Sequence, residues 1–343
     1  MPPVGTGIRG ISRRLGASFA DRTLLSAEAM AIAYVATVAW LASATRFELL
    51  LFPELGALAY DIFRRPNGVW ARSPVMLVMT PFLAGVAGVL VTQWLPFGPV
   101  SVALVIGAAF VILRTLGSPI APALSAGLLP LALGVDSWLY PPALLVGAGG
   151  LAAIAALRPK GKTSLAPAAP PVEDLIETPP PGLHWAPVFV LFLALMTLLV
   201  MVTGERMLLF PPLVVMANEM LSHPHVCPWA RGPWRLPGAV LIIALVGATV
   251  VYLLGPTAAA AALIMLTAGR VLAVFDLHAP PAVAVGLIPM VLPVSPTLAG
   301  QLLFAAEATT ATAILVVTCK LWRMAVKRWR LRELAMSREG LDR

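Results

Sequence analysis

The chain has 343 residues, of which 59% are hydrophobic and 12% charged, and its mean hydropathy is +0.89. Soluble domains are far less apolar, so this composition excludes an ordinary soluble protein and indicates an all-α polytopic membrane protein. The net charge is +8. Residues 1–26 hold four arginines against one aspartate, and residues 320–343 hold eight lysines and arginines against three acids, so the two ends carry the excess. Cationic tails beside apolar spans are typical of cytoplasmic anchoring and argue against nucleic-acid binding.

A motif that recurs 158 to 159 residues further along the chain predicts a duplicated membrane unit. Leu50-Leu51-Phe52-Pro53 returns as Leu208-Leu209-Phe210-Pro211, and Trp70-Ala71-Arg72 returns as Trp229-Ala230-Arg231. Between these two sequence matches, each copy contains an acidic residue followed by a proline that interrupts the apolar run. We therefore expect two pseudo-symmetric helical repeats.

Each half contains six apolar segments. In the first half they lie at 28–44, 47–63, 75–95, 99–116, 121–133 and 139–157, and in the second at 186–203, 206–221, 236–254, 257–274, 280–293 and 297–322. A membrane-spanning helix needs about 20 residues, so the second and fifth segments of each half are too short and are interrupted by proline. They predict short, tilted or re-entrant helices, which are tolerated only where they are buried in protein or line a wet cavity. We expect the functional site there.

The same pattern divides the chain into five parts. They are a basic cytoplasmic tail (1–26), a first membrane repeat (27–157), a linker rich in proline and alanine (158–184), a second membrane repeat (185–322) and a basic cytoplasmic tail (323–343). The linker is expected to be exposed and without a fold of its own. Ala42-Ser43-Ala44 resembles a signal-peptide cleavage site, but a similar apolar run precedes the second copy, which favours a retained helix.

Lysine and arginine placement predicts the orientation in the cell membrane. Both tails and the linker are basic and are expected inside, so each half crosses an even number of times and the repeats are parallel. The alternative is five crossings per half with inverted repeats.

Acidic residues inside the apolar unit are the first candidates for function. Asp61 and Glu219 occupy the same place in the two copies, and Asn218 stands where the first copy has Tyr60. Glu54 precedes Asp61 by seven residues, which puts both on one helix face if the helix is continuous. A carboxylate inside a membrane is costly, so these residues predict a solute pathway; the alternative is an interfacial ion pair with nearby arginines.

Arginines near the same motif supply the matching positive charge. Arg72 and Arg231 follow the carboxylates, and Arg114 and Arg270 end the fourth segments. Together they would form a cationic ring at one mouth of a pore, which would attract a small anion. The alternative is that these side chains extend to the membrane interface.

Histidines give weaker signals. His223, His225 and Cys227 place three metal-ligand types in five residues, but without a second ligand cluster a polar loop is favoured. His278 precedes a proline pair at a helix start, where it would hydrogen-bond a ligand, titrate or cap the helix. No nucleotide, dinucleotide or hydrolase motif is present, so no catalytic residue, cofactor or bound metal is predicted.

Small residues recur in the third and fourth segments and predict close helix packing. They are Gly85, Gly88, Gly107, Gly247 and Gly269.

With these residues in place, the chain resembles the HPP family of integral membrane proteins. Leu55-Gly56-Ala57-Leu58-Ala59, Pro66 and Ala71-Arg72-Ser73-Pro74 are similar to that family's Phe-Gly-Ala-Ser-Ala through Ala-Gln-Pro-Arg stretch. His278-Ala279-Pro280-Pro281-Ala282 is similar to its His-Pro-Pro-Ala motif with one alanine inserted. The chain would be a tandem form of a unit usually found once. Plant plastid members are associated with nitrite transport, so the resemblance implies a small-anion permease.

The sequence therefore predicts a membrane transporter or channel for a small anionic solute, and not an enzyme. Its partners would be the lipid bilayer and a small molecule or ion; the oligomeric state is not predicted. Arg72 and Arg231 would hold the anion, and Asp61 and Glu219 would position those arginines or carry a proton. The alternatives are a metal-dependent membrane enzyme built on His223, His225, Cys227 and His278, and a non-transporting scaffold or sensor.

Overall fold

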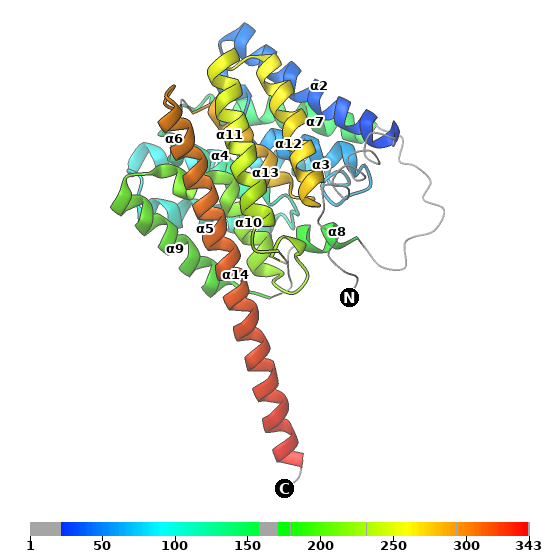
Figure 1. The fold of residues 1–343 in the computed structure, drawn as a ribbon, viewed down its shortest axis with the longest axis vertical. Coiled ribbons are helices and arrows are strands. Elements are labelled where there is room, and N and C mark those ends of the chain that lie inside the picture. Colours follow the sequence, from blue (N-terminus) through cyan, green and yellow to red (C-terminus); the bar gives the residue numbers. More distant parts are fainter. Residues whose placement is uncertain are drawn as a thin grey trace.

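The computed structural model describes residues 22–157, 171–178, 180, 182–230, 232–292 and 294–341. Within these ranges all regular structure is helical (Figure 1). The first half contains α2 (Arg22–Thr45), α3 (Glu54–Arg64), α4 (Pro74–Trp94), α5 (Pro99–Thr115), α6 (Pro122–Leu133) and α7 (Tyr140–Leu157). The second half contains α9 (Ala186–Thr203), α10 (Pro211–Ser222), α11 (Arg235–Leu254), α12 (Ala258–Phe275), α13 (Pro280–Leu287) and α14 (Leu298–Leu341). Every predicted apolar segment thus coincides with a helix.

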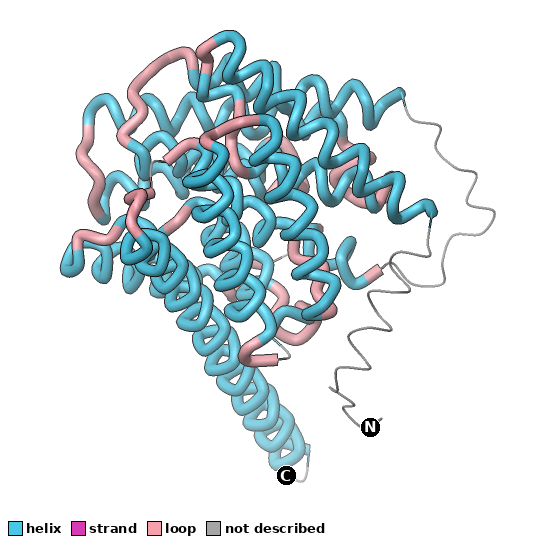
Figure 2. Tube along the Cα trace, turned by 45° about the horizontal axis from the view of Figure 1, so that its top comes forward, coloured by secondary structure: helices cyan, strands magenta, loops and turns pink. Residues whose placement is uncertain are grey.

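Short loops and single turns connect these helices (Figure 2). The turns are η1 (Glu48–Leu50), η2 (Arg206–Leu209), η3 (Pro228–Ala230) and η4 (Ile288–Met290). Proline in the first turn starts α4, α5, α6, α10 and α13, where its missing N–H costs no hydrogen bond. Gly134 and Gly204 end α6 and α9 in the left-handed conformation that favours glycine.

Seven of the described helices are long and apolar enough to cross a membrane: α2, α4, α7, α9, α11, α12 and α14. Large apolar side chains such as Trp94, Val202 and Leu253 are exposed on their outer faces. A soluble protein would not leave so much apolar surface in water, whereas a bilayer covers it at no cost. The architecture is that of a multi-pass membrane protein.

Four short helices form the centre of the bundle. In α3, α6, α10 and α13 nearly every residue is buried, as expected for segments enclosed by protein. The short helices of the two halves pack against each other, α3 on α13 and α10 on α6. The outer helices do the same, since α2 packs on α12. Each half therefore depends on the other for its core.

Matched contacts recur in the two halves. The indole Nε1 of Trp70 donates to the Pro119 carbonyl at 3.1 Å, and Nε1 of Trp229 donates to the His278 carbonyl at 2.8 Å. Gly88 lies against the backbone of Gly127, and Gly247 against that of Gly286. Both pairs are related by the 159-residue offset of the sequence repeat. The duplication itself stays a prediction, and these contacts are what it would lead us to expect.

Close packing explains most of the predicted glycines. A Cβ at Gly85, Gly88 or Gly247 would meet a neighbouring helix, as expected. The prediction is wrong for Gly107, whose Cβ would meet nothing within 4 Å, because α5 is splayed away from its neighbour there.

The segment between the halves contains α8 (Val172–Glu177), which lies at the edge of the bundle (Figure 1). Ile176 and Glu177 are buried against the membrane helices. The expectation of a linker without a fold is wrong here, because the acidic side chains of α8 find a buried arginine. Residues 158–170 lie outside the described residues.

The ends of the chain complete the fold. The basic N-terminal tail falls almost wholly outside the described residues, which begin at Arg22. Helix α14 continues without a break to Leu341 and projects beyond the bundle (Figure 1), so the predicted C-terminal tail is an extension of the last helix.

Candidate functional site

Asp61 is the centre of the candidate site. It lies in the last turn of α3, in one continuous helix with Glu54, and it is completely buried. Its Oδ1 atom lies 2.8 Å from Nε2 of His278, in the turn before α13, and accepts a hydrogen bond from Arg65 at 3.1 Å. The ring of Tyr60 stacks on His278 with 5.6 Å between centroids. The imidazole is therefore held by both a hydrogen bond and a stacking contact.

Arg65 joins this aspartate to α8. Its guanidinium donates to both carboxylate oxygens of Glu177 and to Asp174, as well as to Asp61. Asp174 also accepts from Arg72 at 3.3 Å. One largely buried arginine thus serves three acidic residues, two of which are contributed by the segment between the halves.

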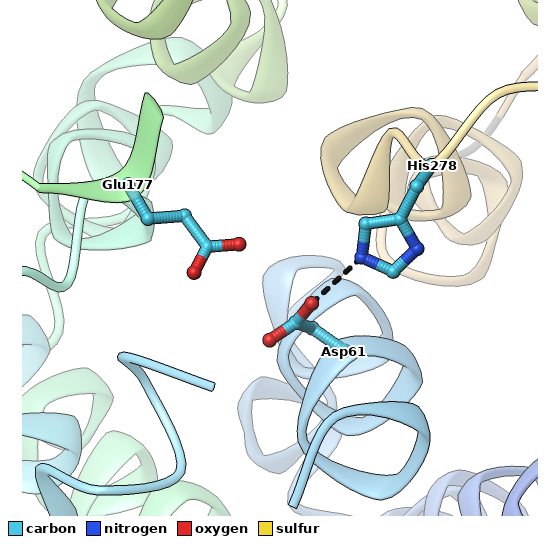
Figure 3. Close-up of side chains that lie close together, drawn as sticks. All are labelled: Asp61, Glu177 and His278. Carbon is cyan, nitrogen blue, oxygen red and sulfur yellow. Dashed lines mark hydrogen bonds and ion pairs between the residues drawn. The ribbon is translucent and has the colours of Figure 1, made fainter. Parts of the chain in front are cut away.

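Asp61, Glu177 and His278 each offer one ligand-type atom, and these atoms lie within 4.8 Å of one another (Figure 3). Carboxylate oxygen and imidazole nitrogen are ligands that Zn²⁺ and similar ions accept. However, the Arg65 guanidinium already bonds both carboxylates. A metal ion would have to displace that side chain or share the carboxylates with it, so the donor set fits an internal ion pair better than a metal.

Glu219 is a second buried acid beside this cluster. Its side chain is 1% exposed, and its Oε1 atom makes no hydrogen bond in the described part of the chain; the same holds for Oδ2 of Asp61. Four residues further along, where the first half has Arg65, the second half has His223. Burial lowers the pKa of His223, so this imidazole tends to be neutral. Glu219 therefore has no permanent cation at the matching position.

Glu177 lies outside the membrane-spanning helices, and its proton affinity is high. Burial, and then the negative charge of Asp61, raise the pKa of Glu177 to about 8, although Arg65 opposes this. A carboxyl group in this range exchanges its proton near neutral pH.

The structure brings together only some of the predicted site residues. Asp61 and His278 are in contact, and Glu219 is buried nearby. Asn218 borders a cavity of about 40 Å³ together with Glu177 and His223. This volume is sufficient for a water molecule.

Glu54 lies at the opposite end of α3, about 10 Å along the helix axis from Asp61. It accepts a hydrogen bond from Ser125 of α6, and its Oε2 atom is buried without a partner among the described residues. It is a separate buried acid on the same short helix, and its partner is on α6, whereas Asp61 contacts the residue that precedes α13.

Among the described residues the predicted cationic ring is not found. The side chain of Arg72 is 57% exposed and bonds Asp174, and Arg231 lies outside the described residues. Arg270 does not join a ring of arginines. It does not extend unpaired to the membrane interface either, because it forms an ion pair with Glu28, which also pairs with Arg64. One carboxylate in the first half of α2 thus pairs with both arginines.

The sequence favoured a polar loop after α10 over a metal site, and among the described residues His223, His225 and Cys227 do not form a ligand cluster. His223 Nδ1 lies 2.8 Å from the Ser222 hydroxyl, His225 is exposed, and the Cys227 side chain is buried. Among all the residues that the structure describes, only Asp61, Glu177 and His278 bring three ligand atoms together.

Sequence reasoning offered the ion pair of Asp61 with a nearby arginine only as the alternative, and it missed the two acids of α8. Arg65 follows Asp61 by four residues, a spacing that places both on one helix face and could have identified the pair. Asp174 and Glu177 gave no comparable signal, because nothing local relates α8 to a helix more than 100 residues earlier.

We compared the chain with known proteins. No family model, no curated protein and no solved structure matches it. The resemblance to the HPP family stays a prediction.

Proposed function

We propose that the protein is a membrane transporter that moves a small anion together with protons. Arg65 would be the anion-binding group, and the carboxylates around it would carry the protons. The observation behind this proposal is a shortage of positive charge among the described residues of a buried cluster. Asp61, Asp174, Glu177 and Glu219 gather around two arginines, of which only Arg65 is largely buried. Buried carboxylates without matching cations favour binding protons.

Protonation is the step that would free Arg65. While Asp61 and Glu177 are ionised, they occupy the guanidinium with hydrogen bonds. When protons neutralise them, the arginine keeps its charge and loses its partners, so an anion can take their place. Release of these protons on the opposite side of the membrane would restore the ion pairs and displace the anion from Arg65. In this way proton movement and anion movement become coupled.

The short central helices supply the place for this exchange. Half-length helices enclosed by full-length ones are the usual setting of transporter sites near the middle of the membrane. The small cavity beside Glu177 and Asn218 provides space for water to bring protons. Because α8 covers Arg65, it must move for a solute to enter from that side. We take the nature of the solute, an anion similar to nitrite, from the resemblance to the HPP family.

The test is flux through purified protein reconstituted in liposomes. Nitrite, nitrate and formate are supplied outside under an inward proton gradient, and a dye inside reports pH. We expect uptake of at least one anion with acidification of the interior. Arg65→Gln should abolish uptake, and Asp61→Asn should make the remaining uptake independent of the gradient.

A matched control uses an acid outside the cluster. Asp136 lies in the exposed loop between α6 and α7, and Asp136→Asn should behave as the unchanged protein. Absence of flux for the whole panel, or uptake that ignores both the gradient and Arg65→Gln, would count against the proposal. Size-exclusion profiles of the variants show whether each one remains folded.

A divalent-cation site is the second candidate function, favoured by the three converging ligand atoms of Asp61, Glu177 and His278. It would suit the metal-dependent membrane enzyme considered from the sequence. Titration of purified protein with Zn²⁺ or Mn²⁺ distinguishes the two proposals. Stoichiometric binding that is lost in His278→Ala and retained in Arg65→Gln would favour the metal site.

A further inference from the structure

A groove lies between α5 and α9. It has a volume of about 640 Å³ and opens on the apolar outer surface of the bundle. Residues of both helices line it, among them Val102, Ile106, Phe110, Phe189, Leu193 and Thr197. By contrast, α2 packs closely on α12, which is the corresponding pair of helices, and leaves a cavity of only about 10 Å³.

Aromatic contacts close one end of the groove. Phe110 packs edge-on against Phe189 at 5.3 Å between centroids, and Trp185 contacts both rings. From Phe110 the groove follows α5 to Pro99, which is about 16 Å along the helix axis. One leaflet of the hydrocarbon core is about 15 Å thick, so the groove is long enough for an acyl chain.

Arg114 stands at the aromatic end of the groove. Its side chain is exposed, and its guanidinium donates to the Pro180 carbonyl at 3.4 Å. It forms no ion pair with a described residue. The nearest arginine of the other pair of helices, Arg270, lies less than one turn before the position that matches Arg114, and it forms an ion pair with Glu28 of α2. The position of α9 that matches Glu28 of α2 is Ala186. The helix that borders the open groove therefore has no carboxylate at this position.

We propose that this groove binds an anionic phospholipid, with one acyl chain between α5 and α9 and the phosphate at Arg114. The apolar walls match the chain, and Trp185 beside the arginine is a residue type typical of the membrane interface. The phosphate takes the position that the Glu28 carboxylate occupies in the other pair. This site is separate from Asp61 and does not depend on the proposed transport.

The test uses the full chain, delipidated in detergent and titrated with phosphatidylglycerol or phosphatidylcholine of the same acyl chains. Native mass spectrometry counts the lipids bound. We expect one phosphatidylglycerol to bind more tightly than any phosphatidylcholine. Arg114→Gln should weaken this binding about five-fold, in line with the contribution of one cation near a lipid phosphate.

Filling the groove provides the second variant. Gly107 lines it, and a Cβ atom there would meet nothing within 4 Å, so we expect Gly107→Leu to fold and to displace the acyl chain. Gly149 of α7 is equally open but lies outside the groove, and Gly149→Leu is the matched control. Arg235→Gln controls for the loss of one partly exposed arginine.

Three results would overturn the proposal. One is equal binding of the two lipids; another is unchanged phosphatidylglycerol binding in Arg114→Gln. The third is the same effect of Gly107→Leu and Gly149→Leu.

Discussion

A methyl group added at Gly88 has no room in this fold. The Cβ atom would lie 3.0 Å from the carbonyl carbon of Gly127, closer still to its oxygen, and 3.2 Å from Pro130. The obstacle is the backbone of α6, which cannot rotate away as a side chain would. Gly88→Ala must therefore push α4 and α6 apart.

The size of the effect follows from two opposing contributions. Overpacking of a close contact costs about 1–3 kcal/mol, and a backbone obstacle places this site at the upper end. Replacing glycine by alanine inside a helix returns about 1 kcal/mol. The net loss for Gly88→Ala is about 2 kcal/mol. Gly247→Ala should lose a similar amount, because its Cβ would lie 2.9 Å from Gly286 Cα.

Gly107 is the matched control, because only the helix-propensity gain of about 1 kcal/mol applies where nothing lies within 4 Å. The assay is thermal unfolding of purified protein in detergent, followed by tryptophan fluorescence. At roughly 2 °C per kcal/mol, Gly88→Ala and Gly247→Ala should melt about 4 °C lower and Gly107→Ala about 2 °C higher. If all three variants shift alike, the close approach of these helices is not what requires glycine.

Three further predictions concern the charged site and the tryptophan hydrogen bonds that support the fold. Arg65→Met should destabilise the protein by about 3–5 kcal/mol in thermal unfolding, because it removes the cation that pairs with the buried Asp61. Arg72→Met, which removes a largely exposed cation, should cost about 1 kcal/mol or less, and equal losses for the two variants would contradict this. Since the pKa of Glu177 rises from 4.5 to about 8 on folding, the folded state binds the extra proton between these values. Stability should therefore fall as pH rises through this window, and Glu177→Gln should flatten that slope in unfolding curves measured from pH 4 to 9. Trp70→Phe and Trp229→Phe should each lower the free energy of unfolding by about 1 kcal/mol, because each loses the indole hydrogen bond to a backbone carbonyl. Unequal losses in thermal unfolding would argue against equivalent roles of the two tryptophans.

Much of the fold was predictable because its signals are local. Apolar runs and proline breaks identified the full-length and short helices, and the repeat motif pointed to Asp61 and Glu219. The functional reasoning was less complete. It assigned anion binding to Arg72 and Arg231, whereas the described structure places Arg65 on the buried carboxylate and Arg72 at the surface.

The amino-acid sequence by itself determined that this is a helical membrane protein, and which short segments carry acids. Hydropathy and proline act within a few residues, so they can be read along the chain. Only the tertiary structure decided that α3 packs on α13, that α8 supplies Glu177 to Arg65, and that the groove between α5 and α9 stays open. Those outcomes depend on contacts between distant segments, and their energies arise only when side chains from both meet.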